Sequence, residues 1–147
     1  MPSHSEIREL PYSAEQMYAV VADVEKYPEF LPWCTRLHVR ERTHEGDSDV
    51  LVADMTVVYH GVSESYVSRV TLNKKAKTVE AVHIEGPFER LTNCWRFEPL
   101  KKGCRIHFFI DFAFRNWFLS ALAGIAFERA VMRTADAFIE RAQSLYG

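Results

Sequence analysis

The sequence predicts an α+β fold in which a curved antiparallel sheet wraps around one long C-terminal helix. Apolar residues alternate with a period of two between Thr35 and Phe114, and turn signals interrupt this stretch at short intervals. A proline-free amphipathic segment, from about Trp117 to Leu145, closes the chain. Because no helical pattern separates the strands, we expect an antiparallel meander rather than βαβ units. The length of 147 residues suits one domain, 1–147.

The chain begins with a short strand and a helix. The strand is expected to end near Leu10, and Ser13 is a suitable N-cap because Gln16 follows at the spacing of a capping box. The apolar residues that come next have the i, i+3, i+4, i+7 spacing of a helix face: Met17, Val20, Val21 and Val24. The helix is therefore expected to run to about Val24.

The segment DVEKYPEFLPWC, from Asp23 to Cys34, is unusually apolar for a connection. Pro28 and Pro32 prevent it from forming one regular helix. Its large apolar side chains are Tyr27, Phe30, Leu31 and Trp33. Either these side chains fill the protein's own core, or they form the mouth of a site that receives an apolar ligand.

Six strands are expected between this segment and the last helix. Turn signals separate them at residues 45–49, 60–61, 73–77, 86–87 and 99–103. Alternation places apolar residues on a common strand face, as in Leu51, Ala53, Met55, Val57 and Tyr59, or Ile106, Phe108, Ile110, Phe112 and Phe114. The apolar stripe of the final helix consists of Gly124, Phe127, Val131, Ala135, Phe138, Ala142 and Leu145. A bent sheet around such a helix is either filled solidly or encloses a tunnel.

Composition and motifs argue against several classes of function. The formal net charge is −2, so no direct DNA binding is expected. The three cysteines form no CxxC pair and the six histidines form no metal-ligand pattern, which disfavours a metal site and a disulfide framework. The absence of a disulfide framework fits the reducing cytoplasm. The sequence has no Gly-rich phosphate loop and no nucleophile signature, so it identifies no catalyst. No apolar run approaches the roughly 18 residues of a membrane span, and no export signal is expected.

Three polar residues share strand faces with apolar neighbours. Glu64 and Ser68 alternate with Tyr66 and Val70, and Asn93 lies on the face of its strand that is otherwise apolar. If these faces point inward, the polar groups need hydrogen-bond partners. They either satisfy one another and the backbone, or they orient a ligand's carbonyl or hydroxyl.

Four motifs, in this order and spacing, carry a family resemblance. They are DVEKYPEFLPWC, GPFERLTNCWRFEPL at 86–100, HFFIDFAFRNWF at 107–118 and AFIERAQSLYG at the end. Over essentially the whole chain, the sequence resembles the coenzyme Q-binding proteins of the START/polyketide-cyclase-like superfamily. That group also includes a bacterial ribosome-association toxin of very similar sequence.

The resemblance implies a helix-grip fold with a lipid-binding tunnel between the sheet and the last helix. It implies a non-enzymatic role in respiration, in which ubiquinone or a polyprenyl precursor is the ligand and no cofactor is needed. The implied mouth consists of Tyr27, Pro28, Phe30, Leu31, Pro32 and Trp33. The expected walls are Leu51, Met55, Tyr66, Leu91, Trp95, Phe108, Ile110, Phe127 and Val131, with Glu64, Ser68 and Asn93 as polar contacts.

Two alternatives to this lipid chaperone are open. The first is a module that binds the large ribosomal subunit and hinders subunit joining, which the dispersed lysines and the net charge of −2 weaken. The second, weaker still, is a cyclase-type enzyme. Membrane contact is expected to be peripheral, on the inner face of the inner membrane. It would involve Phe30, Leu31 and Trp33 together with WFLSALAGIAF at 117–127, whose Leu119, Leu122 and Ala126 face away from the sheet. The open alternative is that these residues cover one another or a dimer partner.

Overall fold

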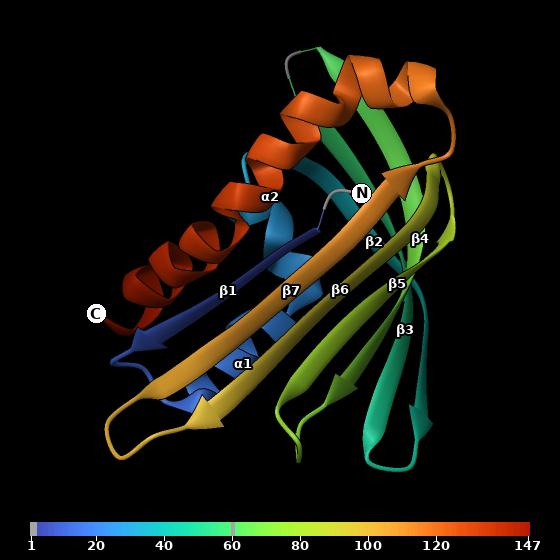
Figure 1. Ribbon diagram of the computed structural model, residues 1–147. Coiled ribbons are helices and arrows are strands. Elements are labelled where there is room, and N and C mark those ends of the chain that lie inside the picture. Colours follow the sequence, from blue (N-terminus) through green and yellow to red (C-terminus); the bar gives the residue numbers. More distant parts are fainter. Residues whose placement is uncertain (1–2, 60) are drawn as a thin grey trace.

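Strands and helices follow one another in the expected order, with the long helix last. The computed structural model describes residues 3–59 and 61–147, without the side chains of Tyr59, Val62, Phe118, Leu119, Leu122, Ala123 and Ala126. In chain order the elements are β1 (Ser3–Leu10), α1 (Ala14–Ala22), the 3-10 helix η1 (Val24–Glu29), β2 (Cys34–Glu45), β3 (Ser48–Tyr59), β4 (Val62–Asn73), β5 (Thr78–Glu85), β6 (Phe88–Pro99), β7 (Cys104–Phe114) and α2 (Trp117–Tyr146) (Figure 1).

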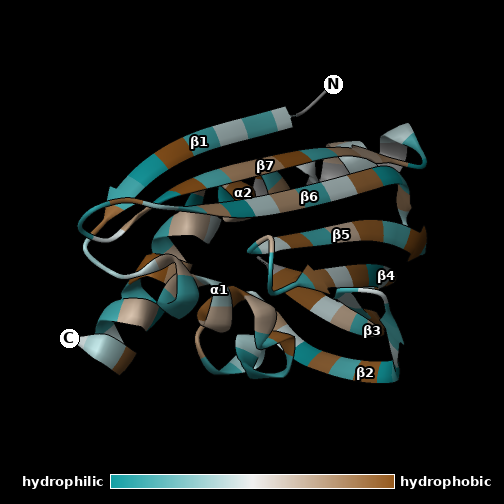
Figure 2. Cartoon of the chain, turned by 90° about the horizontal axis from the view of Figure 1, so that it is seen from below, coloured by the Kyte–Doolittle hydropathy of each residue, from teal (hydrophilic) through white to brown (hydrophobic). Residues whose placement is uncertain are grey.

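The strands form one antiparallel sheet in the order β1-β7-β6-β5-β4-β3-β2. The strands from β2 to β7 are the expected meander, and β1 adds to the outer edge of β7. Bulges, which bend strands, interrupt the pairing at Cys34–Arg36 and Val39–Glu41 in β2, Val67–Ser68 in β4 and Phe88–Arg90 in β6. Figure 2 shows the sheet curving around one side that holds both α1 and α2. The predicted α+β class is confirmed.

The first helix begins as its cap predicts. The Gln16 amide donates to Ser13 Oγ at 3.0 Å, and the Ser13 amide donates to Gln16 Oε1 at 2.9 Å, which completes a capping box. The helix ends at Ala22, two residues before the predicted end, because Val24 already begins η1. Pro28 lies inside η1, so the expectation that the proline segment forms no regular α-helix is confirmed.

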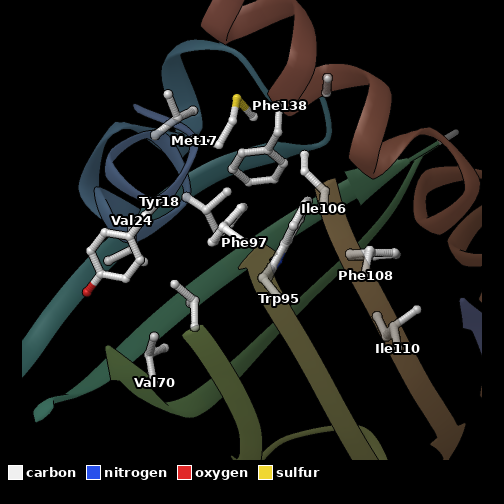
Figure 3. Packing of buried hydrophobic residues seen from close by; sticks show 14 of the residues in the cluster. Met17, Tyr18, Val24, Val70, Trp95, Phe97, Ile106, Phe108, Ile110 and Phe138 are labelled. Atoms are coloured by element: carbon white, nitrogen blue, oxygen red, sulfur yellow. The ribbon is translucent and has the colours of Figure 1, made fainter. Parts of the chain in front are cut away.

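The core lies between the concave face of the sheet and the two α-helices. Its largest fully buried side chains include Phe97 and Phe112 from the sheet and Phe138 from α2. Figure 3 shows how Met17 and Tyr18 of α1 meet this group. Leu145 was expected on the buried stripe of α2, and this expectation is wrong, since 52% of Leu145 is exposed. At the last turn it is Tyr146 that faces α1, where its hydroxyl donates to the Gln16 carbonyl at 3.4 Å.

Within the described residues, no helix combines the length and the apolar character that crossing a membrane requires.

Candidate ligand cavity

A partly enclosed cavity of about 160 Å³ lies between the concave face of the sheet, η1 and α2. Strand alternation positions most of its walls, because every second side chain of a strand points to the same face. On β3, for example, Met55 and Val57 both border the cavity. From α2, the side chains on the inward stripe close the other wall, and Phe127, Val131 and Phe138 are among them.

Most of the residues that the sequence assigns to the site border this cavity. They are Tyr27, Leu31, Trp33, Met55, Glu64, Tyr66, Ser68, Leu91, Asn93, Trp95, Phe108, Ile110, Phe127 and Val131. Figure 3 shows three of them, Trp95, Phe108 and Ile110, on neighbouring strands β6 and β7. The alternation of polar and apolar side chains was therefore a good guide to which residues face the cavity.

Four of the assigned residues lie outside the cavity lining: Pro28, Phe30, Pro32 and Leu51. Leu51 is fully buried in the hydrophobic core cluster, which also includes Met17 and Tyr18 of α1. Phe30 packs edge-on against Phe138 at a ring distance of 5.1 Å, with Arg141 over its own ring. Both side chains contribute to packing rather than to the cavity wall.

The structure adds lining residues that the sequence analysis had not selected. They are Val24, Leu37, Ala53, Val57, Val70, Val79, Ala81, Phe88, Phe114, Ala130, Thr134 and Phe138. Several of them, such as Ala53 and Val57, share a strand face with selected residues, and strict alternation could have identified them. Thr134 had no such signal, because a threonine on a helix is usually solvated.

The proline segment fills the core and lines the cavity at once. Tyr27 donates its hydroxyl to the Val21 carbonyl, and burial raises the pKa of Tyr27, so this hydroxyl stays protonated. Its ring packs edge-on against Phe138 at 5.0 Å. Leu31 is 3% exposed and borders the cavity. The two roles considered for this apolar segment, filling the core and bordering a ligand site, therefore occur together in one segment.

An aromatic cluster closes the cavity beneath the beginning of α2. Phe127 lies 4.6 Å from Phe112, 5.1 Å from Phe88 and 5.7 Å from Phe114, measured between ring centroids. Such edge and tilted contacts add to the stabilisation from apolar burial. Through these contacts Phe127 attaches this part of α2 to the sheet.

The polar groups of the cavity differ in how far their hydrogen bonds are used. Asn93 donates from Nδ2 to the Phe109 carbonyl at 3.0 Å and accepts from Trp95 Nε1 at 3.2 Å. Asn93 therefore serves the fold at least in part. In the described part of the chain, by contrast, Glu64 and Ser68 have no side-chain hydrogen bond or ion pair with another residue.

Thiol and metal chemistry have little support in this geometry. Burial raises the pKa of both Cys34 and Cys104 to about 11, which keeps these thiols protonated and unreactive. The third cysteine, Cys94, donates to Glu80 Oε2 at 3.7 Å and has a raised pKa, first because of burial. Among the residues that the structure describes, no three histidine, cysteine or acidic side chains are grouped as metal ligands would be.

The membrane-facing patch expected from the sequence is only partly exposed. Leu31 points inward and Phe30 packs on Phe138, so these two side chains do not form an outward patch. On α2, Trp117 is 79% exposed and Ile125 is 67% exposed. The expected orientations of Leu119, Leu122 and Ala126 lie outside the described residues.

Residues 10–139 match the family described as polyketide cyclase/dehydrase and lipid transport. The chain is 35% identical over 147 residues to the ribosome association toxin RatA of Escherichia coli K12, covering 99% of this chain and 90% of the toxin. It is also 35% identical over 149 residues to the mitochondrial coenzyme Q-binding protein COQ10 homolog B of Xenopus laevis, covering 98% of this chain and 59% of that protein.

Solved structures also match along the chain. The solution structure of an 18 kDa protein from Caulobacter crescentus superposes with a TM-score of 0.80 and 33% identity, covering 100% of this chain and 99% of that one. The resemblance inferred from the four motifs is confirmed at the level of the family.

Proposed function

The protein belongs to the polyketide cyclase/dehydrase and lipid transport family, and we propose that it binds an isoprenoid quinone or its precursor as a non-enzymatic lipid chaperone. The observation that carries this proposal is the cavity, whose lining is apolar except for a few side chains such as Glu64, Ser68 and Asn93. Such walls suit a ligand with an apolar body and a small polar head. The likeness to a coenzyme Q-binding protein supports the same ligand class.

The free energy of binding would come mainly from the apolar chain. Each methylene group removed from water contributes about 0.8 kcal/mol. The cavity of about 160 Å³ is close in size to engineered cavities of roughly 150 Å³ that accept benzene. It can therefore hold one ring or one isoprene unit as it stands, and a longer chain requires the wall to move or the chain to leave through the mouth.

A tryptophan at Val131 tests the proposal. Val131 is 5% exposed and borders the cavity, so Val131→Trp should fill it and weaken quinone binding at least tenfold. The neighbouring Met132 is 57% exposed, which makes Met132→Trp a matched control that should bind normally. Binding is measured by native mass spectrometry and by lipid extraction of the purified protein. Undiminished binding by a folded Val131→Trp variant would contradict the proposal.

A second candidate function is association with the ribosome. The likeness to a ribosome association toxin over 99% of this chain favours it. Sedimentation of the purified protein with ribosomes and separated subunits in a sucrose gradient tests this candidate. Comigration of an empty protein with one subunit would favour ribosome association, whereas a quinone-loaded protein that stays at the top would favour the chaperone.

Peripheral membrane contact is part of the proposed chaperone role. A carrier of an isoprenoid chain must collect and release it at a membrane, where that chain is soluble. Trp117 and Ile125, both largely exposed on the uncharged beginning of α2, are suited to this contact. They lie on the element that also covers the cavity through Phe127.

A further inference from the structure

Strand β4 presents polar side chains to an otherwise apolar wall. Glu64, Tyr66 and Ser68 occupy alternate positions, and all three border the cavity. We call these three residues the polar row. Alternate side chains on a strand are about 7 Å apart, so one substituted ring can reach two neighbouring members of the row.

The polar row can form further hydrogen bonds, whereas other polar groups of the cavity already have partners within the protein. The Thr134 hydroxyl donates to the Ala130 carbonyl at 2.8 Å, and the Tyr27 hydroxyl donates to the Val21 carbonyl. Tyr66, in contrast, donates only to the thioether sulfur of Met55, at 3.3 Å. A thioether is a weak acceptor, so this hydroxyl can turn to a better partner.

The other two members of the row have no internal partner in the described chain. Ser68 is 7% exposed, and neither its hydroxyl nor the Glu64 carboxylate has a side-chain hydrogen bond to a described residue. Polar groups in an apolar cavity are stabilised only when something bonds them. The Ser68 hydroxyl and the Glu64 carboxylate therefore indicate which polar groups the head of the ligand carries.

Each residue of the polar row requires a particular hydrogen-bonding group on the ligand. Burial raises the pKa of Tyr66, so its hydroxyl stays protonated and donates to a ligand oxygen. A carboxylate oxygen accepts hydrogen bonds, so a ligand O–H would satisfy the Glu64 side chain. Gly86 allows the chain to pass close to Tyr66, since a Cβ at this position would lie 2.6 Å from Tyr66 Cβ.

We propose that the polar row selects a hydroxyl-bearing ring, a hydroquinone or a phenol on an apolar chain, over the oxidised quinone. A hydroquinone donates to Glu64 and accepts from Tyr66 or Ser68. The oxygens of a quinone only accept, so its carbonyl would face the Glu64 carboxylate without a proton between them. This inference rests on the proposed quinone-binding function and adds the oxidation state that the site prefers.

Equilibrium dialysis with decylubiquinone and decylubiquinol, under anaerobic conditions, tests the proposal. The wild type should bind the reduced form at least fivefold more tightly. Glu64→Gln supplies an amide donor in the same shape, so it should bind the oxidised form better and reduce the preference to less than twofold. Glu41, an exposed carboxylate on β2 away from the cavity, provides the control Glu41→Gln, which should keep the wild-type preference.

The outcomes separate this inference from the proposed function. Equal binding of both forms by the wild type, or tighter binding of the oxidised form, overturns the preference while quinone binding stands. If Glu64→Gln keeps the wild-type preference for the reduced form, Glu64 does not recognise the ring, and this result also overturns the inference. If neither form binds, the proposed function itself fails. Tyr66→Phe should weaken both forms, because both accept its hydrogen bond.

Discussion

The two halves of α2 are held to the protein in different ways. The second half, residues 130–146, carries Phe138, whose ring lies 5.0 Å from Tyr27 and 5.0 Å from Trp95. Two ion pairs also attach this half, Asp136 to Arg8 at 2.9 Å and Arg141 to Glu29 at 3.1 Å. In the first half, residues 117–129, the Phe127 ring packs against Phe88, Phe112 and Phe114 of the sheet.

Both halves line the cavity, the first through Phe127 and the second through Ala130, Val131, Thr134 and Phe138. The first half differs in that it exposes Trp117 and Ile125. Since the cavity is about 160 Å³, a long chain needs one wall to give way. We infer that the first half of α2 is this wall, because Phe127, which borders the cavity from this half, is only half-buried, whereas Phe138 in the second half is 1% exposed.

The largest expected effect on the free energy of unfolding is in the second half of α2. Phe138 is 1% exposed, so Phe138→Ala should lower the free energy of unfolding by about 3–5 kcal/mol. Phe127 is only half-buried, so Phe127→Ala should cost less, roughly 1–2 kcal/mol. Urea denaturation followed by circular dichroism measures both. Equal losses at the two positions would refute the proposed division of the helix.

A smaller effect is expected at the ion pair of the second half. Arg141 pairs with Glu29 and lies 5.1 Å above the Phe30 ring. Arg141→Gln should therefore lower the free energy of unfolding by about 1 kcal/mol, the sum of a modest ion pair and a cation–π contact. Arg133→Gln, on the exposed side of the same half, is the control and should change it by less than about 0.5 kcal/mol. An equal response of both variants would assign no role to the Arg141 contacts.

The region beneath the first half should respond to pH through His83. Its Nε2 atom is buried without a hydrogen bond to any described residue, and burial, with the nearby Arg115 charge, lowers the pKa of His83 below its usual 6.5. Tyr66 and Phe88 flank the ring, and the Glu85 backbone partly opposes the shift.

The sign of this pH dependence follows from proton binding. Below pH 6.5 the unfolded chain takes up a proton at His83 more readily than the folded protein, so the free energy of unfolding falls as the pH decreases toward the lower folded pKa. Above 6.5 this contribution is constant. Urea titrations of wild type and His83→Leu across pH 5–8 isolate it, and parallel pH profiles of the two proteins would count against it.

The smallest effect on stability is expected at the exposed beginning of α2. A Trp117→Ser, Ile125→Ser double variant should change the free energy of unfolding by less than about 0.5 kcal/mol, because both residues are largely exposed. It should nevertheless lose flotation with liposomes that contain anionic lipid. Met132→Ser removes an apolar side chain of the second half that is also largely exposed, at 57%, and it should float like the wild type. Equal flotation of all three proteins would remove membrane docking through α2.

The sequence by itself determined the order of the elements and the inward face of each strand. Both depend on local rules, since capping requires Ser13 and Gln16 three residues apart, and side chains alternate along any strand. These rules also placed Glu64, Tyr66 and Ser68 on one face, where the structure finds them.

Only the tertiary structure decided which inward residues reach the cavity. Leu51 and Met55 share a face of β3, but Leu51 is sealed in the core cluster that includes Met17 of α1, and Met55 borders open space. Phe30 is as apolar as its neighbour Leu31, but it packs against Phe138 of α2 instead of lining the cavity. Local spacing determines the face to which a side chain points, whereas the residues that contact it come from segments far away in the chain. For that reason the boundary between core and cavity exists only once α1, η1 and α2 have settled on the curved sheet.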